Sequence, residues 1–128
     1  MALRVLIVDD SKSVRRHIKS LLEASGCRVI TEAPNGLEAI NQYVRYKPDF
    51  VTLDLVMPIL DGLSALEEIR KYDPHAKVMV ITSSLSKKIQ AQAEELGVEI
   101  FVIKPVTLEK IQAALHQLNS PKKVGQYG

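Results

Sequence analysis

The sequence predicts one α/β domain, a doubly wound five-stranded parallel sheet with five helices, and three observations support this prediction. The chain has 128 residues, which is close to the usual size of a single domain. Short apolar runs of four to eight residues alternate with longer stretches whose apolar residues recur three and four positions apart. These units fill the chain without long loops or internal repeats. Such alternation is typical of parallel strands joined by crossover helices.

The short apolar runs are the predicted strands. Two of them, residues 5–8 and 78–81, are apolar throughout, as expected for central parallel strands that helices cover on both faces. The run at residues 28–33 is more polar and is predicted to lie at an edge of the sheet. The full set covers residues 3–8, 28–33, 49–53, 77–82 and 99–103.

The first two helices are indicated by apolar stripes and by residues that start or stop a helix. Gly26 is placed to end the first helix, whose polar residues, Arg15 among them, are expected to face water. Asn35 is placed to cap the second helix, with Glu38 at the position of a capping-box partner, and Pro48 follows the end of that helix. The inward stripes are predicted to be Val14, Ile18, Leu21 and Leu22, and then Leu37, Ile40 and Val44.

The other three helices are predicted at residues 63–72, at residues 86–96 and after Thr107. Pro74 follows the third helix, Gly97 stops the fourth, and Thr107 can cap the fifth. Residues 120–128 contain one proline, two glycines and two lysines without any apolar period. The predicted organisation is therefore one domain over residues 1–119 and a flexible C-terminal tail over residues 120–128.

Composition and charge exclude several classes of function. Seventeen Lys and Arg residues against fifteen Asp and Glu leave a net charge of +2, too small for a field that attracts polyanions, so nucleic acid is not an expected partner of this chain alone. The single cysteine, Cys27, rules out an internal disulfide and fits a reducing compartment. The first apolar run ends at Asp9, and no run of eighteen apolar residues exists. A cytoplasmic protein without membrane insertion is expected.

Reactive side chains follow four of the five predicted strands. Asp9 and Asp10 come after the first strand, Asp54 after the third, Thr82 ends the fourth, and Lys104 follows the fifth. Taken singly, each could be a helix cap or a solvated loop residue. Doubly wound sheets bind ligands beyond the carboxyl ends of their strands, and these groups converge on that edge. We therefore expect one site there.

The residue types at this edge indicate phosphoryl chemistry with a metal ion. Three carboxylates brought together repel one another unless a cation joins them, and oxygen ligands suit Mg²⁺. A lysine and a hydroxyl at the same edge can hold the remaining oxygens of a phosphoryl group. The carboxylate of Asp54 could then act as a nucleophile and form an aspartyl phosphate.

Four segments together resemble the receiver domain of response regulators, of the single-domain chemotaxis type. They are LIVDDS at residues 6–11, DLVMP at residues 54–58 with Asp61-Gly62 after it, ITS at residues 81–83, and FVIKP at residues 101–105. The resemblance extends over about residues 3–118. It implies a flavodoxin-like strand order 2-1-3-4-5.

The resemblance also implies roles for individual residues. Asp54 would be the phosphoacceptor, and Phe101 would be the aromatic switch residue that moves with Thr82. Lys104 would pair with the phosphate or with Asp54, and the Lys104–Pro105 bond would be cis. The implied Mg²⁺ ligands are Asp10 directly, Asp9 largely through water, Asp54, and the backbone carbonyl of Val56.

The implied partners are a sensor histidine kinase or a histidine phosphotransfer protein, and a downstream target. The target would be reached through the surface of the fourth helix, fifth strand and fifth helix. The chain would catalyse phosphoryl transfer onto itself and its own dephosphorylation, without being an enzyme for other substrates.

Two departures from the family pattern and two other interpretations remain. Val56 and Ser84 stand where many relatives have polar or acidic side chains that orient a hydrolytic water, and Phe101 lacks the hydroxyl of the usual tyrosine. A small Mg²⁺-dependent phosphohydrolase with an aspartyl nucleophile is one alternative. It would need a general acid or base where Val56 stands. A receiver fragment of a larger multidomain regulator is the other.

Overall fold

Five parallel strands form one sheet in the order β2-β1-β3-β4-β5, in a computed structural model that describes residues 2–119. This order is the predicted one, and β2 lies at an edge as expected. Each strand begins within one residue of its predicted start and ends where predicted. The strands are β1 Arg4–Val8, β2 Arg28–Ala33, β3 Phe50–Leu53, β4 Val78–Thr82 and β5 Ile100–Ile103.

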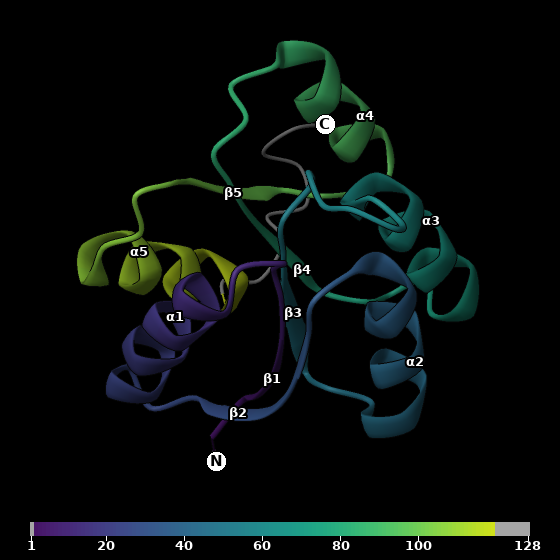
Figure 1. Ribbon diagram of the computed structural model, residues 1–128. Helices are drawn as coiled ribbons and strands as arrows, with labels where there is room; N and C mark the ends of the chain where they lie inside the picture. Colours follow the sequence, from purple (N-terminus) through teal and green to yellow (C-terminus); the bar gives the residue numbers. More distant parts are fainter. Residues whose placement is uncertain (1, 120–128) are drawn as a thin grey trace, which may run out of the picture.

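Helices cover both faces of the sheet, as Figure 1 shows. The helices α1 (Lys12–Ala24) and α5 (Leu108–Asn119) lie on one face. The other face carries α2 (Gly36–Tyr46), α3 (Gly62–Tyr72) and α4 (Lys87–Glu95). The predicted doubly wound fold is confirmed, and the tail predicted over residues 120–128 lies outside the described residues. None of the described helices is both long and apolar enough to cross a membrane.

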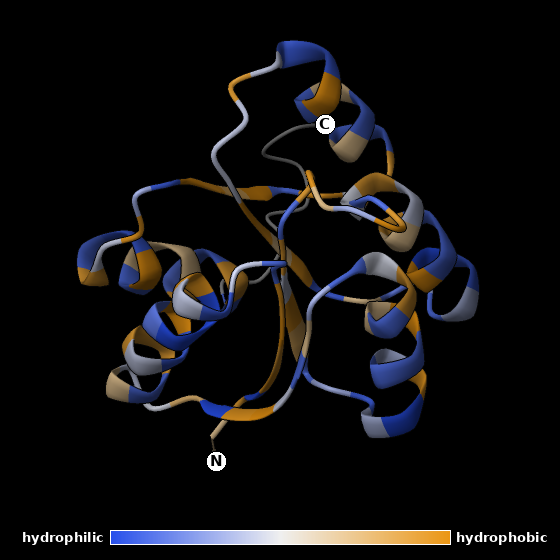
Figure 2. Cartoon of the chain, viewed as in Figure 1, coloured by the Kyte–Doolittle hydropathy of each residue, from blue (hydrophilic) through white to orange (hydrophobic). Residues whose placement is uncertain are grey.

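Alternation along the central strands produces two separate cores. On β1, Leu6 and Val8 join the core beneath α2, α3 and α4, whereas Val5 and Ile7 join the core beneath α1 and α5. All four side chains are at most 1% exposed. Figure 2 shows hydrophobic positions along the strands and alternating hydrophobic and polar positions along the helices. Because alternate residues of the strand point to opposite faces of the sheet, the continuous apolar run contributes side chains to both cores.

Short polar side chains fix where the helices begin. The side-chain oxygens of Asn35 and Asp61 accept hydrogen bonds from backbone N–H groups three residues later, at 2.9 and 2.8 Å. Thr107 accepts in the same way from Lys110 at 3.2 Å. These caps satisfy donors that a helix start leaves without partners, and they set the direction of each chain segment leaving the sheet.

The inward face of α2 differs from the prediction. Ile40 is partly buried against the core as predicted, but Leu37 and Val44 are 53% and 40% exposed. The fully buried residues of this helix are instead Gly36, Ala39 and Tyr43. The stripe is displaced by one position because Tyr43 can be buried: its hydroxyl donates to Asp73 Oδ2 at 2.7 Å, which removes the cost of an unpaired phenol. Counting aliphatic residues alone gave the wrong rotation of this helix.

A guanidinium group holds together the amino-terminal edge of the sheet. Arg70, on α3, donates through Nε to the carbonyl of Leu96 at 2.7 Å, and through Nη1 to the carbonyls of Ala76 and Pro74. These carbonyls belong to the loop before β4 and to the end of α4. One side chain thus joins three segments through backbone acceptors.

Candidate functional site

The carboxyl ends of β1, β3, β4 and β5 bring the predicted site residues together. The backbone N–H of Asp54 donates to the carbonyl of Val8 at 3.0 Å, which places Asp54 beside Asp9. The backbone N–H of Lys104 donates to the carbonyl of Thr82 at 3.0 Å. All four residues therefore lie at one edge, as the positions of the strand ends predict.

Lys104 lies between two carboxylates that come from different strands. Its Nζ is 2.7 Å from Asp9 Oδ2 and 3.1 Å from Asp54 Oδ2. Burial of the ammonium disfavours its charged form, but the hydrogen bonds to Asp9 and Asp54 outweigh this effect and raise the pKa of Lys104 above its ordinary value. The lysine is thus a fixed cation at the centre of the site.

The second oxygen of Asp54 accepts two neutral hydrogen bonds. Thr82 Oγ1 and the backbone N–H of Val56 each lie 3.1 Å from Asp54 Oδ1. The hydroxyl of Thr82 also accepts from the backbone N–H of Ser84 at 3.2 Å, and Thr82 is 0% exposed. Donors at the ends of three strands therefore surround one carboxylate and define where further oxygen atoms could be held.

The three carboxylates form a group that could hold a metal ion. One oxygen from each of Asp9, Asp10 and Asp54 lies within 4.8 Å of the other two, and residues 2–119 contain no second such group of His, Cys, Asp or Glu. Asp9 is 1% exposed and its Oδ1 accepts from the backbone N–H of Ser11 at 2.9 Å, whereas Asp10 is exposed. An all-oxygen set of this charge fits Mg²⁺.

Arg15 contributes to the site, although the sequence pattern predicts that it faces solvent. Its Nη1 donates to the backbone carbonyl of Asp9 at 2.6 Å, and its Nε donates to Glu32 at 3.0 Å. The contact with Glu32 joins α1 to β2, and the contact with the Asp9 carbonyl holds the turn that carries Asp9 and Asp10. The helical pattern could not reveal this role, since it marks Arg15 only as off the apolar stripe.

Gly62 is required by a close approach that the sequence did not reveal, although Asp61-Gly62 belongs to the segments that carry the resemblance. A Cβ atom at this position would lie 2.1 Å from the backbone oxygen of Asp54 and 2.5 Å from Leu55 Cα. The backbone N–H of Gly62 donates to the carbonyl of Leu55 at 3.1 Å. The start of α3 is thus packed directly against the loop that carries Asp54, and any larger residue would displace that loop.

The remaining predicted residues surround this centre. Val56 is 57% exposed beside Asp54, and Ser84 Oγ accepts from the backbone N–H of Ser86 at 3.3 Å. Phe101 is partly buried on β5, paired in register with Val80 of β4, and packs against the core beneath α4. The Lys104–Pro105 peptide bond is cis, as the resemblance implied.

Comparison with known proteins gives one consistent result. The model of the response regulator receiver domain matches residues 5–116. The chemotaxis protein CheY of Thermotoga maritima is 37% identical over 119 residues, covering 93% of this chain and 99% of that protein. A protein-glutamate methylesterase/protein-glutamine glutaminase of Archaeoglobus fulgidus is 42% identical over 106 residues, which are 80% of this chain but 30% of that protein.

Solved structures agree with these sequence matches. The crystal structure of the CheX–CheY–BeF3–Mg²⁺ complex from Borrelia burgdorferi contains a chain that superposes with a TM-score of 0.89 at 28% identity. The match covers 93% of this chain and 90% of that one. The similarity therefore extends over most of both chains.

Proposed function

Because this chain belongs to the response regulator receiver family, we propose that it is a phosphorylation-activated switch in which Asp54 accepts the phosphoryl group. The donor is a sensor histidine kinase or a histidine phosphotransfer protein. The observation that carries the proposal is the set of donors on Asp54: Thr82, the backbone of Val56, and Lys104. We assign the receiver domain to residues 1–119.

The transfer is an in-line displacement at phosphorus. A carboxylate oxygen of Asp54 forms a new P–O bond while the P–N bond of the phosphohistidine donor breaks. The imidazole leaves with the electron pair of that bond and keeps its ring neutral by taking a proton from water. Lys104 and Thr82 point at Asp54 before transfer, so their N–H and O–H groups are placed to donate to the oxygens of the new phosphoryl group.

Mg²⁺ is the cofactor that the oxygen donors fit. Asp10 would bind it directly, Asp9 largely through water, and Asp54 and the backbone carbonyl of Val56 would complete the protein ligands. Asp9 already accepts from Ser11 and Lys104, whereas Asp10 is exposed, which supports this division. When bound, Mg²⁺ supplies positive charge that offsets the charge on the phosphoryl oxygens.

The signal leaves through the surface of α4, β5 and α5, where a downstream target binds. Thr82 contacts Asp54, and β4 pairs with β5 so that Val80 lies opposite Phe101. A phosphoryl group that draws the Thr82 hydroxyl inward changes the space available to Phe101. Phosphorylation then favours one of two conformations because only one of them makes these contacts.

The alternative of a phosphohydrolase for small esters has less support. The family is that of receiver domains, and the position two residues after Asp54 carries Val56, which cannot act as a general acid or base. The match to only 30% of the Archaeoglobus protein shows that a similar sequence also forms part of a longer protein. If this chain is part of a larger regulator, the proposed role of the receiver domain is the same.

Intact mass after incubation with acetyl phosphate and Mg²⁺ tests the proposal. We expect one added phosphoryl group in the unmodified chain and none in Asp54→Asn, because an amide cannot attack phosphorus. Asp61→Asn is the matched control: its carboxylate lies in the same loop but caps α3, and an amide can still cap. Uptake by Asp54→Asn at the unmodified level would overturn the acceptor assignment, and rapid turnover of p-nitrophenyl phosphate would favour the phosphohydrolase.

A further inference from the structure

The outer face of α2 carries apolar side chains that the core does not use. The helix packs against β1, β2 and α3, and its buried residues are Gly36, Ala39 and Tyr43. Leu37 and Val44 lie seven positions apart, which places both on one side of the helix, and both are exposed. These two residues, called here the outer stripe, have the spacing of side chains that pack against another helix.

Two unpaired charges stand beside the outer stripe. Glu38 is the only acid of α2 and Arg45 is its only base, and each directly follows one residue of the stripe. Both are exposed, and neither forms an ion pair within the part of the chain that the structure describes. The Arg45 guanidinium lies 5.4 Å from the centre of the Tyr46 ring. The stripe therefore has an unpaired acid beside one end and an unpaired base beside the other.

Further cations lie at the carboxyl end of α2. Lys47 caps this end and is exposed, and the Arg4 guanidinium donates to the carbonyls of Tyr46 and Lys47 at 2.7 and 2.8 Å. Asp49 is an acid at the same end, where its carboxylate accepts from the backbone N–H of Arg4 at 2.7 Å. With Arg45, three cations stand against one acid, so this end is positive, whereas Glu38 makes the first turn negative.

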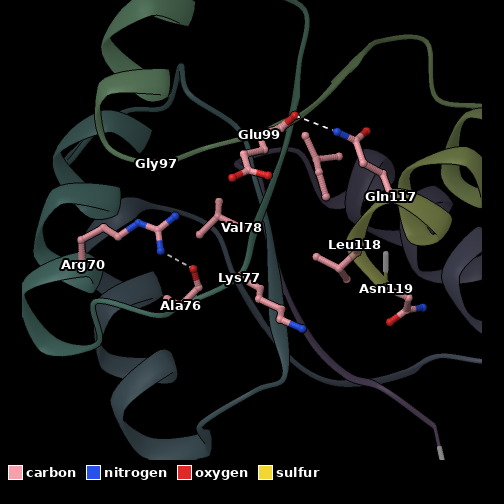
Figure 3. A pocket seen from close by; sticks show the side chains of 10 residues that line it. Arg70, Ala76, Lys77, Val78, Gly97, Glu99, Gln117, Leu118 and Asn119 are labelled. Carbon is pink, nitrogen blue, oxygen red and sulfur yellow. Dashed lines mark hydrogen bonds between the residues drawn. The ribbon is translucent and has the colours of Figure 1, made fainter. Parts of the chain in front are cut away.

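Two other surfaces differ from the outer face of α2 because their long polar side chains have partners. On the neighbouring helix α3, Lys71 pairs with Glu67 and Glu68. At the hollow between the starts of β4 and β5, Arg70 and Gln117 donate to backbone carbonyls, as Figure 3 shows. The charges of α2 are instead available to a partner.

We propose that the outer face of α2 binds a second copy of this chain, with the two α2 helices antiparallel around a two-fold axis near Asn41. In this arrangement Leu37 of each copy meets Val44 of the other, and Glu38 of each copy meets Arg45 of the other. A two-fold contact requires one self-complementary surface, and the charges of α2 meet this requirement. Parallel helices would instead bring like charges together.

The contact between two copies is expected to be weak. The helix has 11 residues and is therefore about 16 Å long. One helix of this length offers less than the roughly 800 Å² per partner that stable interfaces bury. Association should therefore appear at protein concentrations of about 0.1 to 1 mM. The proposal does not depend on phosphorylation of Asp54, and each can fail without the other.

Sedimentation equilibrium and NMR on the full-length chain test the proposal. The average mass should rise from one chain toward two as the concentration increases to about 1 mM. The amide signals of Leu37, Asn41 and Val44 should shift with concentration, whereas that of Ala113 on α5 should not. Leu37→Ser should weaken the association at least about tenfold, because apolar contact is lost in both copies. A chain that stays a single copy at about 1 mM would overturn the proposal, and the outer stripe would then have a different occupant.

Charge reversal distinguishes this arrangement from unspecific apolar association. Glu38→Arg and Arg45→Glu should each weaken self-association about tenfold, because each places like charges together at two points. An equimolar mixture of the two variants should associate at least as strongly as the unmodified chain, because every such contact then joins opposite charges. Glu23→Arg is the matched control, an exposed acid on α1 that should leave association unchanged. If the mixture associates no more strongly than each variant alone, the proposal is wrong.

Discussion

The two edges of the sheet are each organised around a cation, but the cations have different partners. At the carboxyl edge, Lys104 lies between the carboxylates of Asp9 and Asp54. At the amino edge, the Arg70 guanidinium donates to the backbone carbonyls of Leu96, Ala76 and Pro74. Both cations join segments that are distant in sequence.

The difference explains why one edge can perform chemistry and the other serves as scaffold. A carboxylate can exchange its partner for a metal ion or a phosphoryl group, because its charge attracts any cation that enters. Backbone carbonyls bound by a forked guanidinium have no such exchange to make, and removing the arginine leaves acceptors unpaired. The carboxylates at the carboxyl edge can therefore exchange their ionic partners, whereas the carbonyls at the amino edge keep theirs.

The largest effect is expected for Lys104→Met. Removing the ammonium leaves the buried carboxylates of Asp9 and Asp54 facing each other, which we expect to lower the free energy of unfolding by roughly 3 kcal/mol without Mg²⁺. Millimolar Mg²⁺ should restore much of this loss, because it takes over the role of the cation. Urea unfolding with and without Mg²⁺ measures both; a loss that Mg²⁺ leaves unchanged would contradict the comparison.

Arg70→Met should have the next largest effect on stability, and Mg²⁺ should not restore the loss. Three carbonyls lose their charged donor, so the free energy of unfolding should fall by about 2 kcal/mol, and Mg²⁺ should not restore it. Lys71→Met is the control, because Lys71 is exposed and its pairs with Glu67 and Glu68 lie on the surface. Phosphoryl uptake by the folded variant should equal that of the unmodified chain.

Asp10 and Asp9 should contribute unequally to the affinity for Mg²⁺. Asp10→Ala should weaken Mg²⁺ binding by about tenfold, or 1.4 kcal/mol, because a direct ligand is lost. Asp9→Ala should weaken it less, since Asp9 acts through water and through Lys104. Titration of each variant with Mg²⁺, followed by NMR, gives the two affinities. Unchanged affinity in Asp10→Ala would show that the exposed carboxylate is not a ligand.

The smallest effect concerns the lifetime of the phosphoryl group. Val56→Asn should speed its hydrolysis about threefold to tenfold, or up to about 1.4 kcal/mol in activation free energy, because an amide can hold water in line behind phosphorus. Ser84→Glu should add to this effect. The measurement is the rate at which the phosphorylated protein decays at fixed Mg²⁺. If both variants decay at the rate of the unmodified chain, these two residues do not control the lifetime by positioning water.

The positions of the site residues could be predicted because parallel strands place their carboxyl ends together. Asp9, Asp54 and Lys104 each follow a recognisable strand and Thr82 ends one, so their convergence follows from topology. Arg15 could not be predicted in the same way. Its partner is a backbone carbonyl on a turn, and nothing in the helical period distinguishes it from a solvated arginine.

By itself, the sequence determined the order of the elements and the composition of the site. Apolar periods of two kinds distinguish strands from helices, and right-handed crossovers then leave few ways to arrange them. Asn35 and Thr107 mark helix starts by local hydrogen bonds, which depend only on residues three positions apart. Local geometry of this kind is readable from the chain alone.

Only the tertiary structure decided the rotation of α2, the need for glycine at Gly62, and the sharing of Lys104 between two carboxylates. Each depends on atoms brought together from distant positions; Lys104 and Asp9 are 95 residues apart. A hydrogen bond of about 3 Å requires placement finer than any period of apolar residues can specify. The physical reason is that the side-chain pattern sets which face is buried, while packing sets which atoms meet on that face.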